Sequence, residues 1–247
     1  MSATADPLRL LRTSIHGPGG VGAVLCNAAA GVEPTVAWFE PRYWIARGAL
    51  QGTLAGRGSA VQFEHAGRRF VLRPYRRGGL VAKFNADRFL WTSEARSRPI
   101  RELTLNLMLH AAGLPVPLPV AARYEREGTT YRAALITEYL PDTRSLAQSL
   151  AEEGVGLPVW AAIGRCIRRF HDFGLCHADL NAHNILLRAD EVLLVDFDRC
   201  SRRAPGLWRD ANLARLRRSL DKLEDARAER RFDETQWQCL LAAWFER

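Results

Sequence analysis

The sequence predicts an α+β protein of two lobes, a β-rich first lobe and a mainly helical second lobe. Two observations support this order. Glycine turns and short apolar runs fill residues 51–73, a pattern typical of antiparallel strands. After the turn at Pro141-Asp142, most segments repeat their apolar residues at helical spacing. We therefore expect a first lobe over residues 1–140, whose first 50 residues give little signal, and a second lobe over residues 141–247, with a pocket between them.

In the first lobe, apolar periodicity distinguishes strands from helices. Ile100, Leu103 and Leu107 recur at helical spacing before Gly113, which predicts a helix that ends at this glycine. Residues 1–37 predict no particular element. The predicted elements are strands within residues 51–73, a helix over 99–112, and strands over 121–126 and 133–139.

In the second lobe, one short β-hairpin is expected among helices. Trp160, Ile163 and Ile167 share one helical face, and two apolar runs flank a turn at residues 188–190. The predicted elements are helices over residues 145–152, 158–173, 207–226 and 232–247, and a hairpin of 185–187 with 192–195.

Composition narrows the class of protein. The chain has 247 residues, of which 47% are hydrophobic and 25% charged, so it can bury a core and is not a disordered polymer. It has no run of about 18 uncharged apolar residues, which argues against a transmembrane helix. Its first residues lack the basic-then-apolar order of a signal peptide, so we expect an intracellular protein.

The positive charge is almost entirely arginine. Lys+Arg number 35 against 27 Asp+Glu, a net charge of +8, and the lysines are Lys83 and Lys222 alone. Arginine binds phosphate or carboxylate through two parallel donors. Arginine-rich codon usage would produce the same composition, and an anionic partner such as a nucleotide, a nucleic acid or an acidic lipid is the other explanation.

The cysteines do not form a metal or disulfide pattern. None belongs to a C-x-x-C pair, so we expect reduced thiols in the core and neither a zinc site nor a disulfide framework. They are Cys26, Cys166, Cys176, Cys200 and Cys239.

Three polar residues of the second lobe have the chemistry of phosphoryl transfer. That reaction needs a carboxylate that orients the acceptor hydroxyl, and oxygen ligands that hold Mg²⁺ against the nucleotide phosphates. Asp179 and Asn184 lie five residues apart, and Asp196 follows twelve residues later, after the predicted hairpin. One loop and the end of one strand can therefore supply the base and two metal ligands.

The order H-x-D-L-N-x-x-N followed by D-F-D resembles the catalytic and metal loops of the protein-kinase-like superfamily. The resemblance implies ATP and Mg²⁺ as cofactors. It also implies that Asp179 is the catalytic base and that Asn184 and Asp196 bind the metal ion. For His177 we favour a role in supporting the loop over a chemical one.

The first lobe is then expected to bind the nucleotide. Gly56 and Gly58 precede a pair of strands, where a glycine loop can fold over phosphates through its backbone N–H groups. The following strand ends at Arg73, where kinases usually have lysine. We assign Arg73 as the phosphate-binding cation, and Lys83 remains the alternative.

Two glutamates complete the expected nucleotide site. Kinases pair the strand cation with a helical glutamate, which we assign to Glu102, with Glu94 as the alternative. Residues 135–140 resemble the connector between kinase lobes, whose backbone holds the adenine edge. Glu138 is assigned to the nucleotide site by its position there.

Finer detail resembles one family, the 3-deoxy-D-manno-octulosonic acid (Kdo) kinases. The resemblance runs from about residue 56 to 220, and its motifs are residues 75–80, 113–117, 177–187 and 196–198. It implies ATP-dependent phosphorylation of the 4-hydroxyl of Kdo on Kdo-lipid IVA, a Kdo-bearing lipid A precursor, in lipopolysaccharide core biosynthesis. This acceptor carries a carboxylate, phosphates and acyl chains. We accordingly expect peripheral association with the cytoplasmic side of the bacterial inner membrane, where anionic lipid attracts basic residues.

Two alternatives remain open. The protein could phosphorylate another sugar acceptor, such as a heptose or an aminoglycoside, because the acceptor rests on the family resemblance alone. It could instead be a pseudokinase or a basic nucleic-acid-binding module, which the net charge would suit. We expect no nucleic acid, because the sequence has no helix-turn-helix, zinc or aromatic RNA-binding signature.

Overall fold

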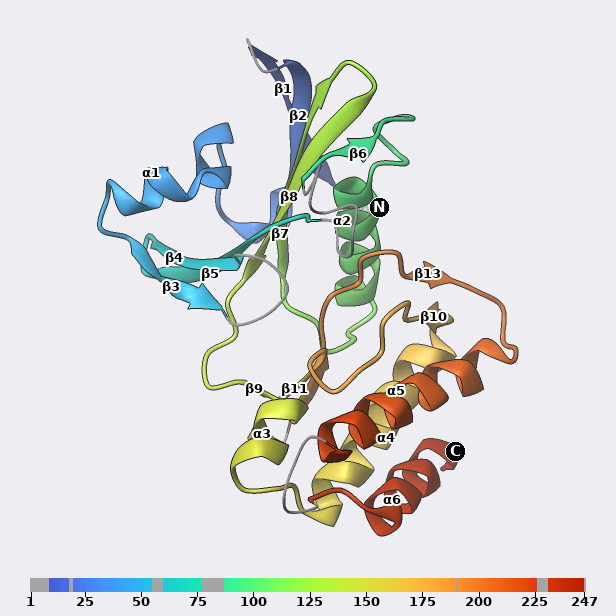
Figure 1. Ribbon diagram of the computed structural model, residues 1–247. Coiled ribbons are helices and arrows are strands. Elements are labelled where there is room, and N and C mark those ends of the chain that lie inside the picture. The colour runs from blue at the N-terminus through green and yellow to red at the C-terminus, as the bar shows by residue number, and fades with distance from the viewer. Residues whose placement is uncertain are drawn as a thin grey trace, which may run out of the picture. The chain divides into compact units, whose positions relative to one another are not determined.

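Antiparallel strands dominate the first half of the chain and helices the second (Figure 1). The computed structural model describes residues 9–17, 20–54, 60–76, 87–189, 191–225 and 231–246. The chain divides into two units, the first made of residues 1–112 and 117–139 and the second of residues 113–116 and 140–247. This arrangement confirms the predicted α+β fold class.

The first unit is built on one antiparallel sheet. Its main path follows the order β1-β2-β7-β8-β5-β4-β3, and β6 pairs with β8 beside that path. The strands are β1 (Leu10–Gly17), β2 (Gly20–Asn27), β3 (Leu50–Leu54), β4 (Ala60–His65), β5 (Arg68–Pro74), β6 (Phe89–Leu90), β7 (Pro119–Glu127) and β8 (Thr130–Glu138).

Both faces of the central strands of this sheet are buried. Successive residues of a strand point to opposite faces, so Ala134 and Ile136 of β8 join one apolar cluster while Ala133 and Leu135 join the other. The first cluster includes aromatic residues of the short helices η2 (Val36–Phe39) and α1 (Pro41–Ile45), which follow η1 (Ala28–Ala30). The second includes the apolar face of α2 (Arg98–Ala111), which lies on the other side of the sheet from α1 (Figure 1).

The second unit consists of helices and two small sheets. Its helices are α3 (Leu146–Glu152), α4 (Leu157–Asp172), α5 (Trp208–Asp225) and α6 (Glu234–Phe245). A three-stranded sheet has the order β12-β11-β9, and β10 pairs with β13. These strands are β9 (Arg144–Ser145), β10 (Leu175–Cys176), β11 (Ile185–Arg188), β12 (Glu191–Leu194) and β13 (Ser201–Arg202).

A glycine allows α4 and α6 to pack closely. A Cβ atom on Gly164 would lie 2.2 Å from the carbonyl oxygen of Leu240, so the two backbones meet at a position where any side chain would collide. Figure 1 shows the two helices side by side.

The predicted elements after residue 50 lie close to those observed, and the first 50 residues hold more structure than the sequence indicated. The hairpin of β1 and β2 and the helix α1 lie in this stretch. Residues 113–116 belong to the second unit because they bond to it: Leu194 N donates to Pro115 O (3.1 Å) and Arg169 Nη2 to Gly113 O (2.7 Å). Among the residues that the structure describes, no helix is both long and apolar enough to cross a bilayer.

Candidate active site

The loop from His177 to Asn184 joins β10 to β11 and is held by its backbone. Its N–H groups must find partners because the loop forms no regular element. His177 N donates to Asn212 Oδ1 (3.0 Å), Ala178 N contacts Cys200 Sγ (3.2 Å), and Ala182 N donates to Ser219 Oγ (3.2 Å).

Helix α5 holds this loop along one stripe. Asn212 also donates through Nδ2 to His177 O (2.9 Å), so its amide pairs with both backbone groups of one residue. Asn212, Arg215 and Ser219 are spaced i, i+3 and i+7, which places them on one face of a helix. Sequence reasoning assigned no role to these three residues; the signal was a polar stripe beside the apolar one of Leu213, Leu216 and Leu220.

The loop brings Asn184 to the backbone of Asp179. The side-chain amides of Asn181 and Asn184 both donate to Asp179 O, at 3.0 Å and 2.9 Å. Because Asn184 donates through Nδ2, its amide oxygen is directed away from this bond. The structure thus brings two of the predicted site residues, Asp179 and Asn184, together.

The β11–β12 hairpin brings Asp196 to the same place. Ile185 pairs with Leu194, and one step beyond, Val195 N donates to Asn184 O (3.1 Å). Asn184 and Asp196 therefore flank the open end of one hairpin. Asp196 has φ of +65°, a left-handed conformation that is uncommon outside glycine and is found preferentially at functional sites.

These residues fit a magnesium ion by their chemistry. Carboxylate and amide oxygens are the hard ligands that Mg²⁺ accepts, and the ion usually keeps several waters rather than filling an all-protein cage. Asp196 and Asn184 supply one of each. Within the described part of the chain, no group of three or more His, Cys, Asp or Glu is suited to a metal ion.

His177 lies under the loop, 1% exposed. Its Nδ1 accepts a hydrogen bond from Asp179 N (3.2 Å), so Nε2 carries the proton and donates to Val195 O (3.2 Å). Burial lowers the pKa of His177, which keeps the ring neutral. This geometry favours the supporting role over a chemical one.

An arginine contacts the Asp179 carboxylate. Arg215 Nη1 lies 2.9 Å from Asp179 Oδ1, and both side chains are partly exposed, at 47% and 35%. The candidate base therefore has a cation beside it within its own unit.

In the first unit, the structure brings Arg73 and Glu102 together. Arg73, near the end of β5, forms an ion pair with Glu102 of α2, and Tyr75 donates its hydroxyl to the same carboxylate. Glu102 is only 3% exposed, while Arg73 is partly exposed. Burial, followed by the nearby Glu102 charge, raises the pKa of Tyr75 well above its usual range, so the hydroxyl keeps its proton.

The other predicted residues of this unit lie elsewhere or are not described. Glu94 pairs with Arg12 (3.1 Å) rather than with Arg73. Glu138, the last residue of β8, accepts a bond from Arg68 Nη2 (2.9 Å). Gly56, Gly58 and Lys83 lie outside the described residues.

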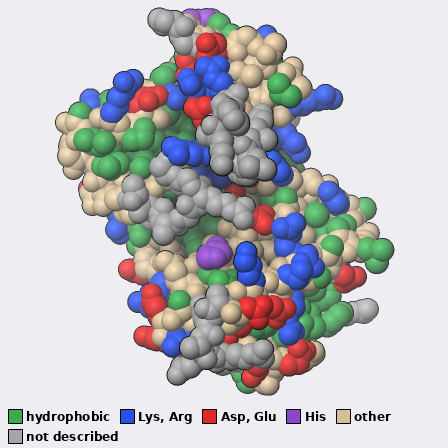
Figure 2. All heavy atoms as spheres, in the orientation of Figure 1, with side chains coloured by type: hydrophobic (Ala, Val, Ile, Leu, Met, Phe, Trp, Pro, Cys, Tyr) green, Lys and Arg blue, Asp and Glu red, His purple; other side chains and the backbone are tan. Residues whose placement is uncertain are grey.

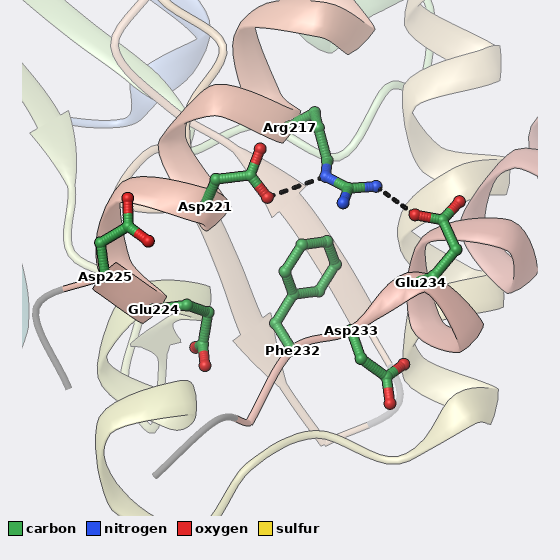
Figure 3. A pocket seen from close by; sticks show the side chains of 7 residues that line it. All are labelled: Arg217, Asp221, Glu224, Asp225, Phe232, Asp233 and Glu234. Carbon is green, nitrogen blue, oxygen red and sulfur yellow. Dashed lines mark hydrogen bonds and ion pairs between the residues drawn. The ribbon is translucent and has the colours of Figure 1, made fainter. Parts of the chain in front are cut away.

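A cavity of about 530 Å³ lies at the end of α5 and the start of α6. Figure 3 shows carboxylates around Phe232, with Arg217 bridging Asp221 (2.9 Å) and Glu234 (2.7 Å). None of the predicted site residues lines it.

The fold and the family match together define a kinase-like phosphotransferase. A solved structure, "WaaP in complex with acyl carrier protein", matches it with a TM-score of 0.53 at 21% identity, covering 84% of this chain and 87% of that chain. Residues 42–244 match the Lipopolysaccharide kinase (Kdo/WaaP) family, and the chain belongs to that family.

Curated relatives specify the family further. The chain is 40% identical over 215 residues to a 3-deoxy-D-manno-octulosonic acid kinase of Actinobacillus succinogenes, covering 84% of this chain and 89% of the relative. It is 44% identical over 211 residues to a protein of the same name from Stenotrophomonas maltophilia, covering 85% and 84%. The resemblance to the Kdo kinases is confirmed.

Proposed function

We propose that this protein is a Kdo kinase, which transfers the γ-phosphoryl group of ATP to the 4-hydroxyl of Kdo on a Kdo-bearing lipid A precursor. The observation that carries the proposal is the similarity to curated Kdo kinases over more than four-fifths of both chains. The loop and hairpin geometry supports it, because these elements gather a carboxylate, an amide and a second carboxylate in one unit.

The residues of this chain suggest how transfer proceeds. The Asp179 carboxylate accepts the proton of the acceptor hydroxyl as its oxygen bonds to the γ-phosphorus, and the bond to ADP breaks. Asn184 and Asp196 would hold Mg²⁺, which neutralises charge on the phosphates. Arg73, fixed by Glu102, would bind phosphate oxygens. Gly56, Gly58 and Glu138 remain proposed members of the nucleotide site.

The acceptor is a lipid, so the protein must work at a membrane surface. We place it peripherally on the cytoplasmic side of the inner membrane, an arrangement that the net charge of +8 favours. On the face shown in Figure 2, basic and acidic side chains are interspersed, so the attraction there comes from dispersed charge. Flotation with vesicles that contain or lack anionic lipid tests this; equal binding to both would contradict it.

The decisive experiment is an acceptor comparison. Purified protein is incubated with ATP, Mg²⁺ and either Kdo-lipid IVA, a heptose-bearing acceptor or an aminoglycoside, and the products are analysed by mass spectrometry. NMR of the product then identifies the phosphorylated hydroxyl. We expect transfer to the Kdo 4-hydroxyl. Preferential transfer to heptose or aminoglycoside would assign the protein to a different sugar kinase, and no transfer to any acceptor would favour a pseudokinase.

A further inference from the structure

We propose that Arg215 binds the carboxylate of the acceptor sugar and so selects acidic sugars, an inference that rests on the proposed function. The starting observation is its contact with the candidate base: Arg215 Nη1 donates to Asp179 Oδ1 across 2.9 Å. Whatever hydroxyl Asp179 deprotonates must come within hydrogen-bond distance of the same carboxylate. The guanidinium is therefore adjacent to the reacting part of the acceptor.

The position of Arg215 is fixed by its neighbours on α5. Asn212, one turn earlier, is 5% exposed and bonds both backbone groups of His177, and Ser219, one turn later, accepts from Ala182 N. These two residues hold the loop through its backbone. Arg215 differs from them because it reaches past the backbone to a functional side chain.

The pair is open to solvent. The exposed fractions of the Arg215 and Asp179 side chains are 47% and 35%, and ion pairs screened in this way add little to stability. Asn212 and Ser219 already anchor the loop, so fold stability does not account for an arginine here. The contact with Asp179 uses one of five N–H donors of a planar fork suited to carboxylates.

The acceptor carries an anion that Arg215 can bind. Kdo carries a carboxylate, which Asp179 would repel as the sugar approaches unless a cation stood between them. Arg215 is that cation, contacting Asp179 on one side and offering its remaining donors to the sugar. A neutral sugar would gain nothing from this arginine, so the residue favours acidic sugars.

The test compares two acceptors in wild type and variants. One acceptor is Kdo-lipid IVA, and the other is the same molecule with the sugar carboxyl reduced to an alcohol. We expect Arg215→Ala to lower kcat/KM for the native acceptor by about tenfold or more, through KM, because a charge-assisted hydrogen bond is lost. For the reduced acceptor the loss should be several-fold smaller than for the native one, and KM for ATP should not change.

Two further variants sharpen the result. Arg215→Lys keeps the charge without the fork and should restore part of the loss. Arg218→Ala removes another exposed arginine of the same helix and should behave as wild type with both acceptors. Equal losses on both acceptors, or no loss on either, overturn the inference while leaving the kinase assignment intact. A wild-type protein that phosphorylates no Kdo acceptor overturns the proposed function instead.

Discussion

His177 donates a hydrogen bond from Nε2 to the carbonyl oxygen of Val195, 3.2 Å away. Its other ring nitrogen accepts from Asp179 N, so one neutral imidazole joins the loop of the candidate base to the residue before Asp196. Two segments that are well separated in sequence are thereby held in register. The predictions for Asp179 and Asp196 depend on this shared support.

Asp179→Asn should abolish transfer without unfolding the protein. The amide cannot accept the acceptor proton, so we expect kcat to fall by about 100- to 10,000-fold. The backbone N and O atoms of Asp179 carry its bonds within the loop, and the substitution leaves these atoms unchanged. Steady-state kinetics and thermal unfolding measure the two effects, and near-normal turnover would remove Asp179 from its role.

Asp196→Asn should weaken the response to magnesium. With one carboxylate charge fewer, the Mg²⁺ concentration that gives half-maximal activity should rise by about tenfold or more. Initial rates over a Mg²⁺ titration measure this. Asp172→Asn, which removes an exposed carboxylate of α4, serves as the control and should leave the titration unchanged. An unaltered titration in Asp196→Asn would exclude this residue as a ligand.

Arg73→Ala should act on both ATP binding and stability. The Glu102 carboxylate is buried, and removal of its arginine would leave the charge poorly compensated, at a cost of about 3–5 kcal/mol. We also expect a higher KM for ATP. Combining Arg73→Met with Glu102→Leu should restore much of the stability but not ATP binding, as urea unfolding and kinetics of the double-mutant cycle would reveal. Additive stability losses would refute the coupling.

Unfolding free energy should fall on acidification through His171. This ring accepts a bond from Trp244 Nε1 (3.1 Å), and burial lowers its pKa to about 4, against about 6.5 when unfolded. Between these values the unfolded chain binds more protons, so stability is full above pH 6.5 and falls as pH drops towards 4, by about 3 kcal/mol.

His171→Gln tests this pH dependence. Its side-chain oxygen can still accept from Trp244, and the slope of unfolding free energy against pH should flatten. Burial also lowers the pKa of His177, so part of the slope will remain. A slope unchanged by His171→Gln would show that other groups cause the acid sensitivity.

Gly164→Ala should destabilise the second unit even though alanine favours helix. The new Cβ would collide with Leu240 O, and we expect a loss of about 1–3 kcal/mol on chemical unfolding. Arg165→Ala, at the adjacent exposed position, should change stability little. Stability equal to wild type in Gly164→Ala would mean that α4 and α6 lie further apart than described.

Local apolar patterns made the hairpin beside the candidate site predictable from the sequence. The apolar runs before Asp196 and after Asn184 predicted the hairpin, and a hairpin places the residues at its open end side by side. Arg73 and Glu102 were assigned differently, through the resemblance to kinases, which pair a strand cation with a helical glutamate, and the structure brings these two residues together. Regular geometry converts spacing into proximity only for the hairpin.

The missed features lack such a pattern. The strand β2 is buried without alternation, and its partner β1 is mostly exposed, so neither has the period of a half-buried strand. Asn212 and Ser219 reach the loop across 35 and 37 residues, a pairing that no local periodicity encodes.

Side chains of helix α5 hold the loop mostly through hydrogen bonds to the loop's main-chain atoms. Hydrogen bonds to main-chain atoms do not depend on which side chain stands at an exposed loop position such as His183. Substitutions at such a position can therefore leave the scaffold of the loop in place, whereas substitutions of Asn212 or Ser219 would remove its anchors.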